Sequence, residues 1–219
     1  MSNPIRSTGQ DSCRWTGQVN CRSIWYRRPD QLPAGDGHSG LEFTAFYKPS
    51  VDTGVFSYAT HAVVVAVDPQ TGKTEVLDYA IVEDCGRIVN PMIVDGQAIG
   101  GTAQGIGSAL YEEVRYDDQG QPLNSTLADY LIPGASEVPH IRVQHMETLS
   151  PHTAHGIKGV GEGGAIAPGG AVVNAINDAL AGLEVEINRI PATAERVLQA
   201  IMEKKLARNE EGQHETRAI

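Results

Sequence analysis

The stretch Asp95-Gly96-Gln97-Ala98-Ile99-Gly100-Gly101-Thr102-Ala103-Gln104-Gly105-Ile106-Gly107-Ser108 is the centre of the fold that we predict for this chain. Four of its five glycines, at positions 100, 101, 105 and 107, lie inside an otherwise helical pattern. A glycine in a helix interior costs about 1 kcal/mol relative to alanine. Close approach of another backbone or of a ligand can offset that cost. Two interpretations stay open: tight helix packing through small residues, or a ligand site in which Gln104 offers both a donor and an acceptor.

The elements around this stretch predict an α+β fold. A helix is predicted over 92–112, with Ile99, Ala103, Ile106 and Leu110 on one face. Two β-branched runs, 61–68 and 74–82, flank a turn at 69–73 and predict a hairpin. We expect further strands at 41–47, 113–116, 141–147 and 185–190, and helices from Pro168 and over 192–207. Strands and helices mix irregularly, which favours mixed sheets with packed helices over a doubly wound parallel sheet.

The chain divides into three parts by composition. Residues 1–38 contain both tryptophans and two of the cysteines but no clear period, and we interpret them as a leader or linker without a core of its own. An ordered arm lying on a partner chain is the alternative. Residues 39–207 are predicted to form the globular domain, and 208–219 a polar tail.

Charge and cysteine content exclude several classes of partner. The net charge of −10 argues against a nucleic acid or an anionic membrane as the main partner. The sequence has no run of about 18 apolar residues, so no membrane span is expected. Cys13, Cys21 and Cys85 form neither a disulfide framework nor a metal-binding pattern. A cytoplasmic location is expected.

The second glycine-rich segment, 156–164, contains a single carboxylate, Glu162, among five glycines. A lone acid held by such a backbone is typical of a catalytic base, and a flexible loop with an incidental acid is the alternative. The fragments Gly105-x-Gly107 and Gly159-x-Gly161 lack the strand, helix and acid of a dinucleotide fingerprint. The sequence therefore argues against nicotinamide or ATP binding.

Four patches in order carry a family resemblance: 60–68, 84–91, 96–113 and 156–162, followed by a fitting segment at 174–180. Residues from about 41 to 201 resemble the C-terminal part of the large, molybdenum-binding subunit of the xanthine dehydrogenase/molybdenum hydroxylase family. The resemblance is nearest to the carbon monoxide dehydrogenase-like large subunits. It implies the α+β molybdopterin-binding domain of those subunits as the fold.

The resemblance also assigns roles to residues. It implies that Glu162 faces the molybdenum as the catalytic base. It places Gln104 and Gly105 against the pterin cofactor, with Gln97 near the same cofactor. The remaining pocket residues that it implies are Lys158, Gly159, Val160 and Gly161. In this family the pterin supplies the molybdenum ligands, so no residue of the chain is expected to bind the metal.

The implied activity is a molybdenum-dependent hydroxylase or dehydrogenase that oxidises an electron-poor carbon, N-heteroaromatic or aldehyde, with water as the oxygen source. The cofactor would be molybdenum-molybdopterin, in the cytosine dinucleotide form, with iron–sulfur clusters and FAD on partner subunits. Family subunits are far longer, so we expect a partner chain to carry the N-terminal part of the molybdenum subunit. A non-catalytic cofactor-holding or assembly subunit, or a truncated inactive remnant, is the alternative. Cys85 matches a different position from the family's copper-binding cysteine, so CO oxidation is not expected.

Overall fold

A computed structural model describes residues 55–217 of the chain. Its strands are β1 (Tyr58–Val67), β2 (Thr74–Asp84) and β3 (Ile141–Met146). Its α-helices are α1 (Pro91–Leu110), α2 (Gly163–Ile166), α3 (Pro168–Leu180) and α4 (Ala194–Arg217), and short 3-10 turns occupy Ala154–Gly156 and Ala181–Leu183. The predicted leader at 1–38 and the predicted strand at 41–47 lie outside the described residues.

The three strands form one mixed sheet in the order β1-β2-β3. β1 and β2 are antiparallel and form the predicted hairpin, whereas β2 and β3 are parallel. A parallel pair requires a long crossover, and here the connection from β2 to β3 contains α1. This mixed arrangement of strands and helices confirms the α+β prediction.

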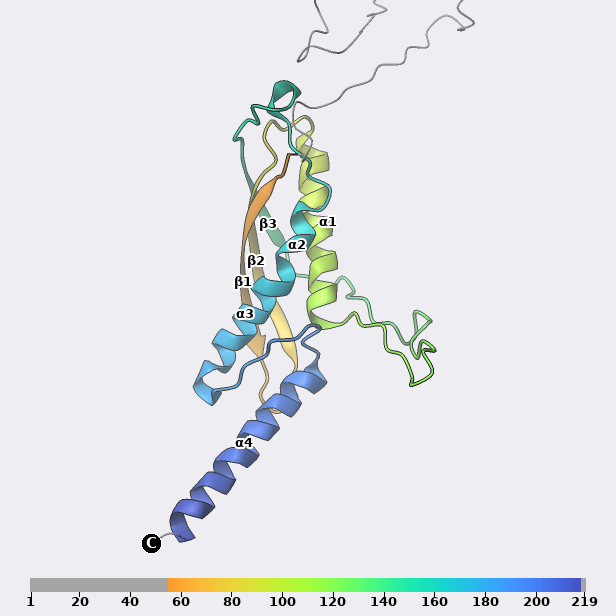
Figure 1. The fold of residues 1–219 in the computed structure, drawn as a ribbon. Helices are drawn as coiled ribbons and strands as arrows, with labels where there is room; N and C mark the ends of the chain where they lie inside the picture. The colour runs from red at the N-terminus through yellow and green to blue at the C-terminus, as the bar shows by residue number, and fades with distance from the viewer. Residues whose placement is uncertain (1–54, 218–219) are drawn as a thin grey trace, which may run out of the picture.

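The hydrophobic core lies between the inner face of the sheet and helices α1 and α3, which run along it (Figure 1). Tyr79 and Ile81 of β2 are fully buried in one hydrophobic cluster with Ile106 of α1 and Ile176 of α3. Burying side chains of this size stabilises the fold by about 1.5–3 kcal/mol each. Helix α4 extends away from the sheet, with Val197 and Ile201 of its first turns buried in the same core.

Helix α1 begins at Pro91, one residue before the predicted start, with Asn90 as its N-cap. The predicted buried face was wrong in part, because Ile99 is 41% exposed. The buried face instead includes Ala98, Thr102 and Ile106. Small residues at this face let α2 and α3 approach the α1 backbone closely, a contact that the spacing of bulky residues does not reveal.

Three of the five glycines in α1 are explained by packing, and Gly96 and Gly100 are not. A Cβ on Gly101 would lie 2.9 Å from the backbone nitrogen of Ala165, and one on Gly105 would lie 2.6 Å from Cγ of Pro168. A Cβ on Gly107 would overlap the Glu112 side chain. A Cβ on Gly100, in contrast, would meet no atom within 4 Å. The packing interpretation therefore accounts for positions 101, 105 and 107, and Gly100 is open to a ligand or partner.

Adjacent substitutions test this difference between the glycines of α1. We expect Gly100→Ala to raise the free energy of unfolding by up to about 1 kcal/mol, because alanine is the better helix former. We expect Gly101→Ala to lower it by about 1–3 kcal/mol, because the new methyl group collides with the α2 backbone. Chemical denaturation of the two variants beside the parent chain measures both changes. Equal effects at the two positions would contradict the packing described for Gly101.

Two predicted strands are absent from the described residues. At 185–190 the backbone N–H and C=O of Ile187 bond to the side chain of Asn177, at 2.7 and 2.9 Å. An amide side chain thus takes the place of a neighbouring strand, although Val185 and Ile187 are still buried. At 113–116 only an isolated bridge, Tyr116 to Pro122, forms.

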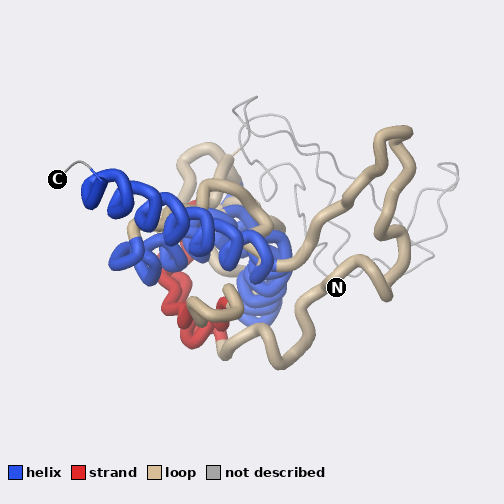
Figure 2. Tube along the Cα trace, turned by 90° about the horizontal axis from the view of Figure 1, so that it is seen from below, coloured by secondary structure: helices blue, strands red, loops and turns tan. Residues whose placement is uncertain are grey.

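The segment 111–140 has no helix or longer strand in the described structure, and it loops away from the sheet (Figures 1 and 2). Glu113 in this segment forms an ion pair of 2.5 Å with Arg196 of α4. Helix α4 starts near the predicted position, with Thr193 Oγ1 accepting from the Arg196 N–H, but it continues to Arg217. The predicted end of the last helix at 207 was therefore wrong.

Candidate functional site

Glu162 lies on the turn that immediately precedes α2 and is that helix's N-cap residue. The turn is closed by hydrogen bonds from Gly163 N–H to the Val160 carbonyl, 3.3 Å, and from Ala165 N–H to the Glu162 carbonyl, 2.9 Å. The loop predicted over 148–166 thus ends in a short helix. The Glu162 side chain is exposed, so its carboxylate is accessible to a ligand.

Helix α1 holds this turn on both sides of Glu162. Nε2 of Gln97 donates to the Gly161 carbonyl at 3.3 Å, and Oγ1 of Thr102 donates to the Gly164 carbonyl at 3.1 Å. A Cβ on Gly164 would overlap the carbonyl oxygen of Ala98. The structure therefore brings the two glycine-rich segments of the sequence into contact, 64 residues apart at Gln97 and Gly161.

The other predicted cofactor-binding residues of α1 differ in exposure. Gln104 is exposed, whereas Gly105 is buried beneath Pro168. Gln97 and Gln104 are seven residues apart, or nearly two turns, so they share one side of the helix with the open Gly100 between them. A Cβ on Gly159 also would meet no atom within 4 Å. This side of α1 and the Glu162 turn together present amides, a carboxylate and open backbone.

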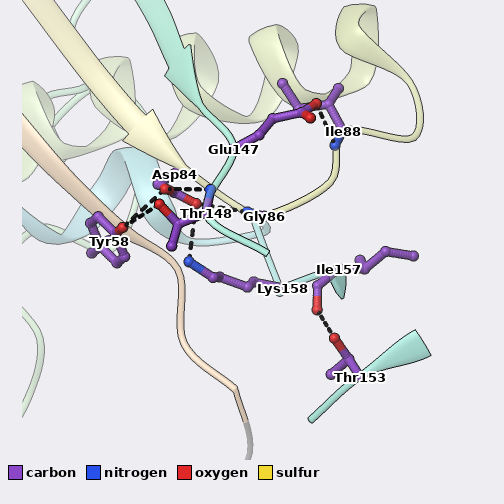
Figure 3. A network of polar contacts seen from close by, with 9 residues as sticks. All are labelled: Tyr58, Asp84, Gly86, Ile88, Glu147, Thr148, Thr153, Ile157 and Lys158. Atoms are coloured by element: carbon purple, nitrogen blue, oxygen red, sulfur yellow. Dashed lines mark hydrogen bonds and ion pairs between the residues drawn. The ribbon is translucent and has the colours of Figure 1, made fainter. Parts of the chain in front are cut away.

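The predicted pocket residue Lys158 is turned inward, where Nζ lies 3.0 Å from Oδ1 of Asp84 (Figure 3). The two side chains are only 7% and 1% exposed. The ammonium also lies 4.5 Å from the centre of the Tyr58 ring, a cation–π contact. In this arrangement the ammonium of Lys158 is already bonded within the chain, and its direct effect is on the position of the 156–162 loop.

Asp84 is the most densely bonded carboxylate in Figure 3. Besides Lys158, it accepts hydrogen bonds of 2.9 Å from Tyr58 Oη, Thr148 N and Gly86 N. Burial alone would raise the pKa of Asp84, but the hydrogen bonds from Thr148, Gly86, Lys158 and Tyr58 hold it well below its usual range. Asp84 is therefore ionised in the folded protein and pairs with a charged lysine.

Backbone contacts also hold the 156–162 loop against the end of β2. The Lys158 N–H donates to the Cys85 carbonyl at 2.8 Å, and Gly86 forms an isolated bridge with Ile157. Gly86 has a φ of 69°, and a Cβ there would overlap the Gly156 carbonyl oxygen. The end of β2 thus fixes the start of the loop that carries Glu162.

Sequence analysis missed the polar end of β2. It placed the strand end at residue 82, but Glu83 and Asp84 belong to β2 and both are 1% exposed. His145 lies on β3, within the strand predicted over 141–147, with Nε2 2.6 Å from Oδ1 of Asp95. Two consecutive acids directly after an apolar strand are the one local signal that could have drawn attention to this region.

Within residues 55–217 no cluster of three or more His, Cys, Asp and Glu side chains is arranged to hold a metal ion. No helix in the same range has the length and apolar character needed to cross a bilayer. The Cys85 thiol is buried, and burial, with the nearby Glu83 next in importance, raises its pKa.

Comparisons with known proteins agree with this architecture. Residues 15–139 match the family model of the molybdopterin cofactor-binding domain. The chain is 44% identical over 175 residues to the nicotine 6-hydroxylase large subunit of Paenarthrobacter nicotinovorans, covering 80% of this chain and 21% of that protein. It is 37% identical to the carbon monoxide dehydrogenase large chain of Hydrogenophaga pseudoflava, covering 81% and 22%.

A solved structure of quinoline 2-oxidoreductase from Pseudomonas putida 86 superposes with a TM-score of 0.64 at 54% identity, covering 65% of this chain and 18% of the other. The chain thus spans about a fifth of the length of these relatives. The family model covers more than half of the chain, and the mixed sheet with its packed helices matches the solved relatives. The chain belongs to the molybdopterin cofactor-binding domain family and matches a part of molybdenum hydroxylase large subunits.

Proposed function

We propose that this chain supplies one side of the active site of a molybdenum-dependent hydroxylase or dehydrogenase, with Glu162 as the catalytic base. The observation that carries the proposal is the exposed Glu162 carboxylate on a turn bonded to α1 at both Gly161 and Gly164. A carboxylate held this way accepts a proton from a defined position. The substrate class is an electron-poor carbon, N-heteroaromatic or aldehyde, with water as the oxygen source.

The named relatives favour the N-heteroaromatic class. Nicotine and quinoline, the compounds in the names of two relatives, both contain an aromatic ring nitrogen, and these relatives are 44% and 54% identical to the chain. The carbon monoxide dehydrogenase chain is 37% identical. A ring carbon next to nitrogen is electron-poor, so it is open to attack by an oxygen nucleophile.

The residues of the site fit a molybdopterin cofactor. Open space beside Gly96, Gly100 and Gly159 leaves the backbone accessible to a flat or phosphate-bearing ligand. Gln97 and Gln104 would hold its polar edge with amide groups, and the backbone of Val160 and Gly161 would line the same pocket. Gly105 would contribute by letting Pro168 pack against α1 beside Gln104. Lys158 contributes by holding the loop through Asp84. When bound, the cofactor supplies the two-electron redox chemistry.

The chain's own catalytic step is a proton transfer. A Glu162 carboxylate oxygen takes the proton that water must lose before its oxygen can attack the substrate carbon, and then releases it. We propose the cytosine dinucleotide form of the cofactor, iron–sulfur and FAD partner subunits that carry the electrons away, and a cytoplasmic location.

The alternative is a non-catalytic cofactor-holding or assembly subunit, or an inactive remnant, in which Glu162 has no role in turnover. The Glu162→Gln variant in the assembled enzyme separates these functions: turnover falls with the cofactor retained if Glu162 is the base, and is unchanged if it is not.

Metal content tests whether a second polypeptide completes the site. Small-molecule sites usually bury most of the ligand surface, whereas the Glu162 turn and the Gln104 face of α1 are exposed here. We therefore expect the 219-residue chain alone to retain little molybdenum, and the chain purified with the remaining part of the large subunit to retain it stoichiometrically. Elemental analysis of both preparations gives the answer. Stoichiometric molybdenum on the lone chain would refute the shared site.

A further inference from the structure

A second buried carboxylate lies beside the Glu162 turn, and the proposed mechanism does not use it. Glu83 of β2 is 1% exposed, and neither of its carboxyl oxygens has a hydrogen-bond partner among the described residues. Burial raises the pKa of this group, and the nearby His145 acts in the opposite direction. Buried polar groups in native proteins are nearly always bonded, so these two oxygens require a partner.

His145 has an unbonded atom next to Glu83. The two residues are paired in the parallel ladder of β2 and β3, so their backbones lie about 4.8 Å apart and their side chains share the inner face of the sheet. Nδ1 of His145 is buried without a partner, while Nε2 is held by Asp95 of α1. One buried water needs two to four polar partners, and Glu83 and His145 together offer three.

The Glu83 carboxyl group also limits where the Glu162 turn can lie. A Cβ on Gly163 would overlap Oε1 of Glu83, so the acid fills the space that a side chain at 163 would take. The α1 contacts described above hold residues 161 and 164. The residues around Glu162 are thus fixed by α1 at positions 161 and 164 and contacted by Glu83 at position 163.

We propose that Glu83 is a positioning residue for Glu162. Together with His145 and Asp95 it forms an acid–imidazole–carboxylate chain, buried at Glu83 and half-exposed at Asp95, which holds the turn. One water between Glu83 and His145 closes this chain of polar groups. The inference rests on the proposed function, because only a base at Glu162 gives the turn's position a chemical consequence. If the role of Glu83 were purely steric, an apolar side chain of the same length would fill it equally well. The hydrogen-bonded role proposed here requires polar atoms at position 83.

Two substitutions of equal length separate the two roles. Glu83→Met removes the polar atoms, and Glu83→Gln keeps groups that bond water and His145. Hydrogen–deuterium exchange of the full chain is followed at the amides of residues 161–165. We expect exchange about tenfold faster in Glu83→Met and near that of the parent in Glu83→Gln, since local opening sets these rates. Glu75→Met, at an exposed position on the same strand, is the matched control and should leave the exchange rates of residues 161–165 unchanged.

Parent-like exchange in Glu83→Met, or equal acceleration in the Met and Gln variants, would overturn the proposal. If Glu83→Met does not fold, His145→Phe decides, because it removes both ring nitrogens and keeps a ring. His145→Phe should accelerate exchange at the same amides, and unchanged exchange rates would again contradict the proposed role of Glu83 and His145. Exchange rates do not depend on turnover. If Glu162 is not the base, the turnover of Glu162→Gln will show it, whatever the exchange rates of the Glu83 variants.

Discussion

Replacing Glu162 with glutamine in the assembled, cofactor-loaded enzyme is expected to lower kcat by about 10²–10⁴-fold, the range that general-base catalysis contributes. Glutamine has nearly the same shape and retains hydrogen-bonding groups, but its amide does not accept a proton at neutral pH. Glu162 is exposed and its turn is held through backbone carbonyls at 161 and 164, so the substitution leaves those contacts in place. Steady-state kinetics with molybdenum content measured on the same sample gives the comparison.

A matched substitution shows whether the effect belongs to this carboxylate. Glu186 is also exposed and lies on the loop after α3, so Glu186→Gln removes the same charge from a different place and should leave kcat unchanged. Unchanged turnover in Glu162→Gln would remove Glu162 from the mechanism. Loss of molybdenum together with turnover would instead make Glu162 a cofactor-binding residue, contrary to the proposed role.

Lys158→Met is expected to lower the free energy of unfolding by about 3–5 kcal/mol, because it leaves the buried Asp84 carboxylate without its cation. Lys158 and Asp84 are 7% and 1% exposed, so water cannot replace the lost partner. The exposed pair Arg142–Asp78, at 61% and 47%, is the control, and Arg142→Met should cost less than about 1 kcal/mol. Urea denaturation measures both. Equal losses at the two pairs would contradict a buried role for Lys158.

The Asp84 pKa gives this prediction a pH dependence. The folded-state pKa of Asp84 is lowered, so its contribution to stability is present above the unfolded-state value near 3.9 and is lost as the pH falls below it. In Lys158→Met the unpaired charge disappears when Asp84 is protonated. The difference between parent and variant should therefore be largest above about pH 4 and should narrow in more acidic solution. A difference that widens in acid would contradict the ion pair.

Much of the fold could be predicted because its signals are local. Alternation and turn residues identified the β1–β2 hairpin and β3, helical periodicity identified α1, and Pro168 marked the start of α3. The predicted strand at 185–190 failed because a side chain, Asn177, took the hydrogen bonds that a neighbouring strand would have made. The residues 185–190 by themselves give no sign that a side chain will replace the neighbouring strand.

The ion pair between Lys158 and Asp84 shows a second feature that the sequence did not predict. Lys158 was predicted from the resemblance as a pocket residue, but its ammonium bonds Asp84, 74 residues away in the chain. Glu83 and His145 are 62 residues apart in number and adjacent only through the parallel ladder of β2 and β3. Burial and pairing of charges depend on such distant contacts, so they become visible only when the strands are placed side by side.

The sequence by itself determined the elements of the hairpin and of helices α1 and α3, and, through its ordered patches, the family and the Glu162 segment. Only the tertiary structure decided which glycines of α1 are packed, that Lys158 faces inward, and that Glu83 lies against Gly163. The reason is physical: periodicity and turn chemistry act over a few residues along the chain, whereas burial, overlap and charge pairing act through space between segments that the fold brings together.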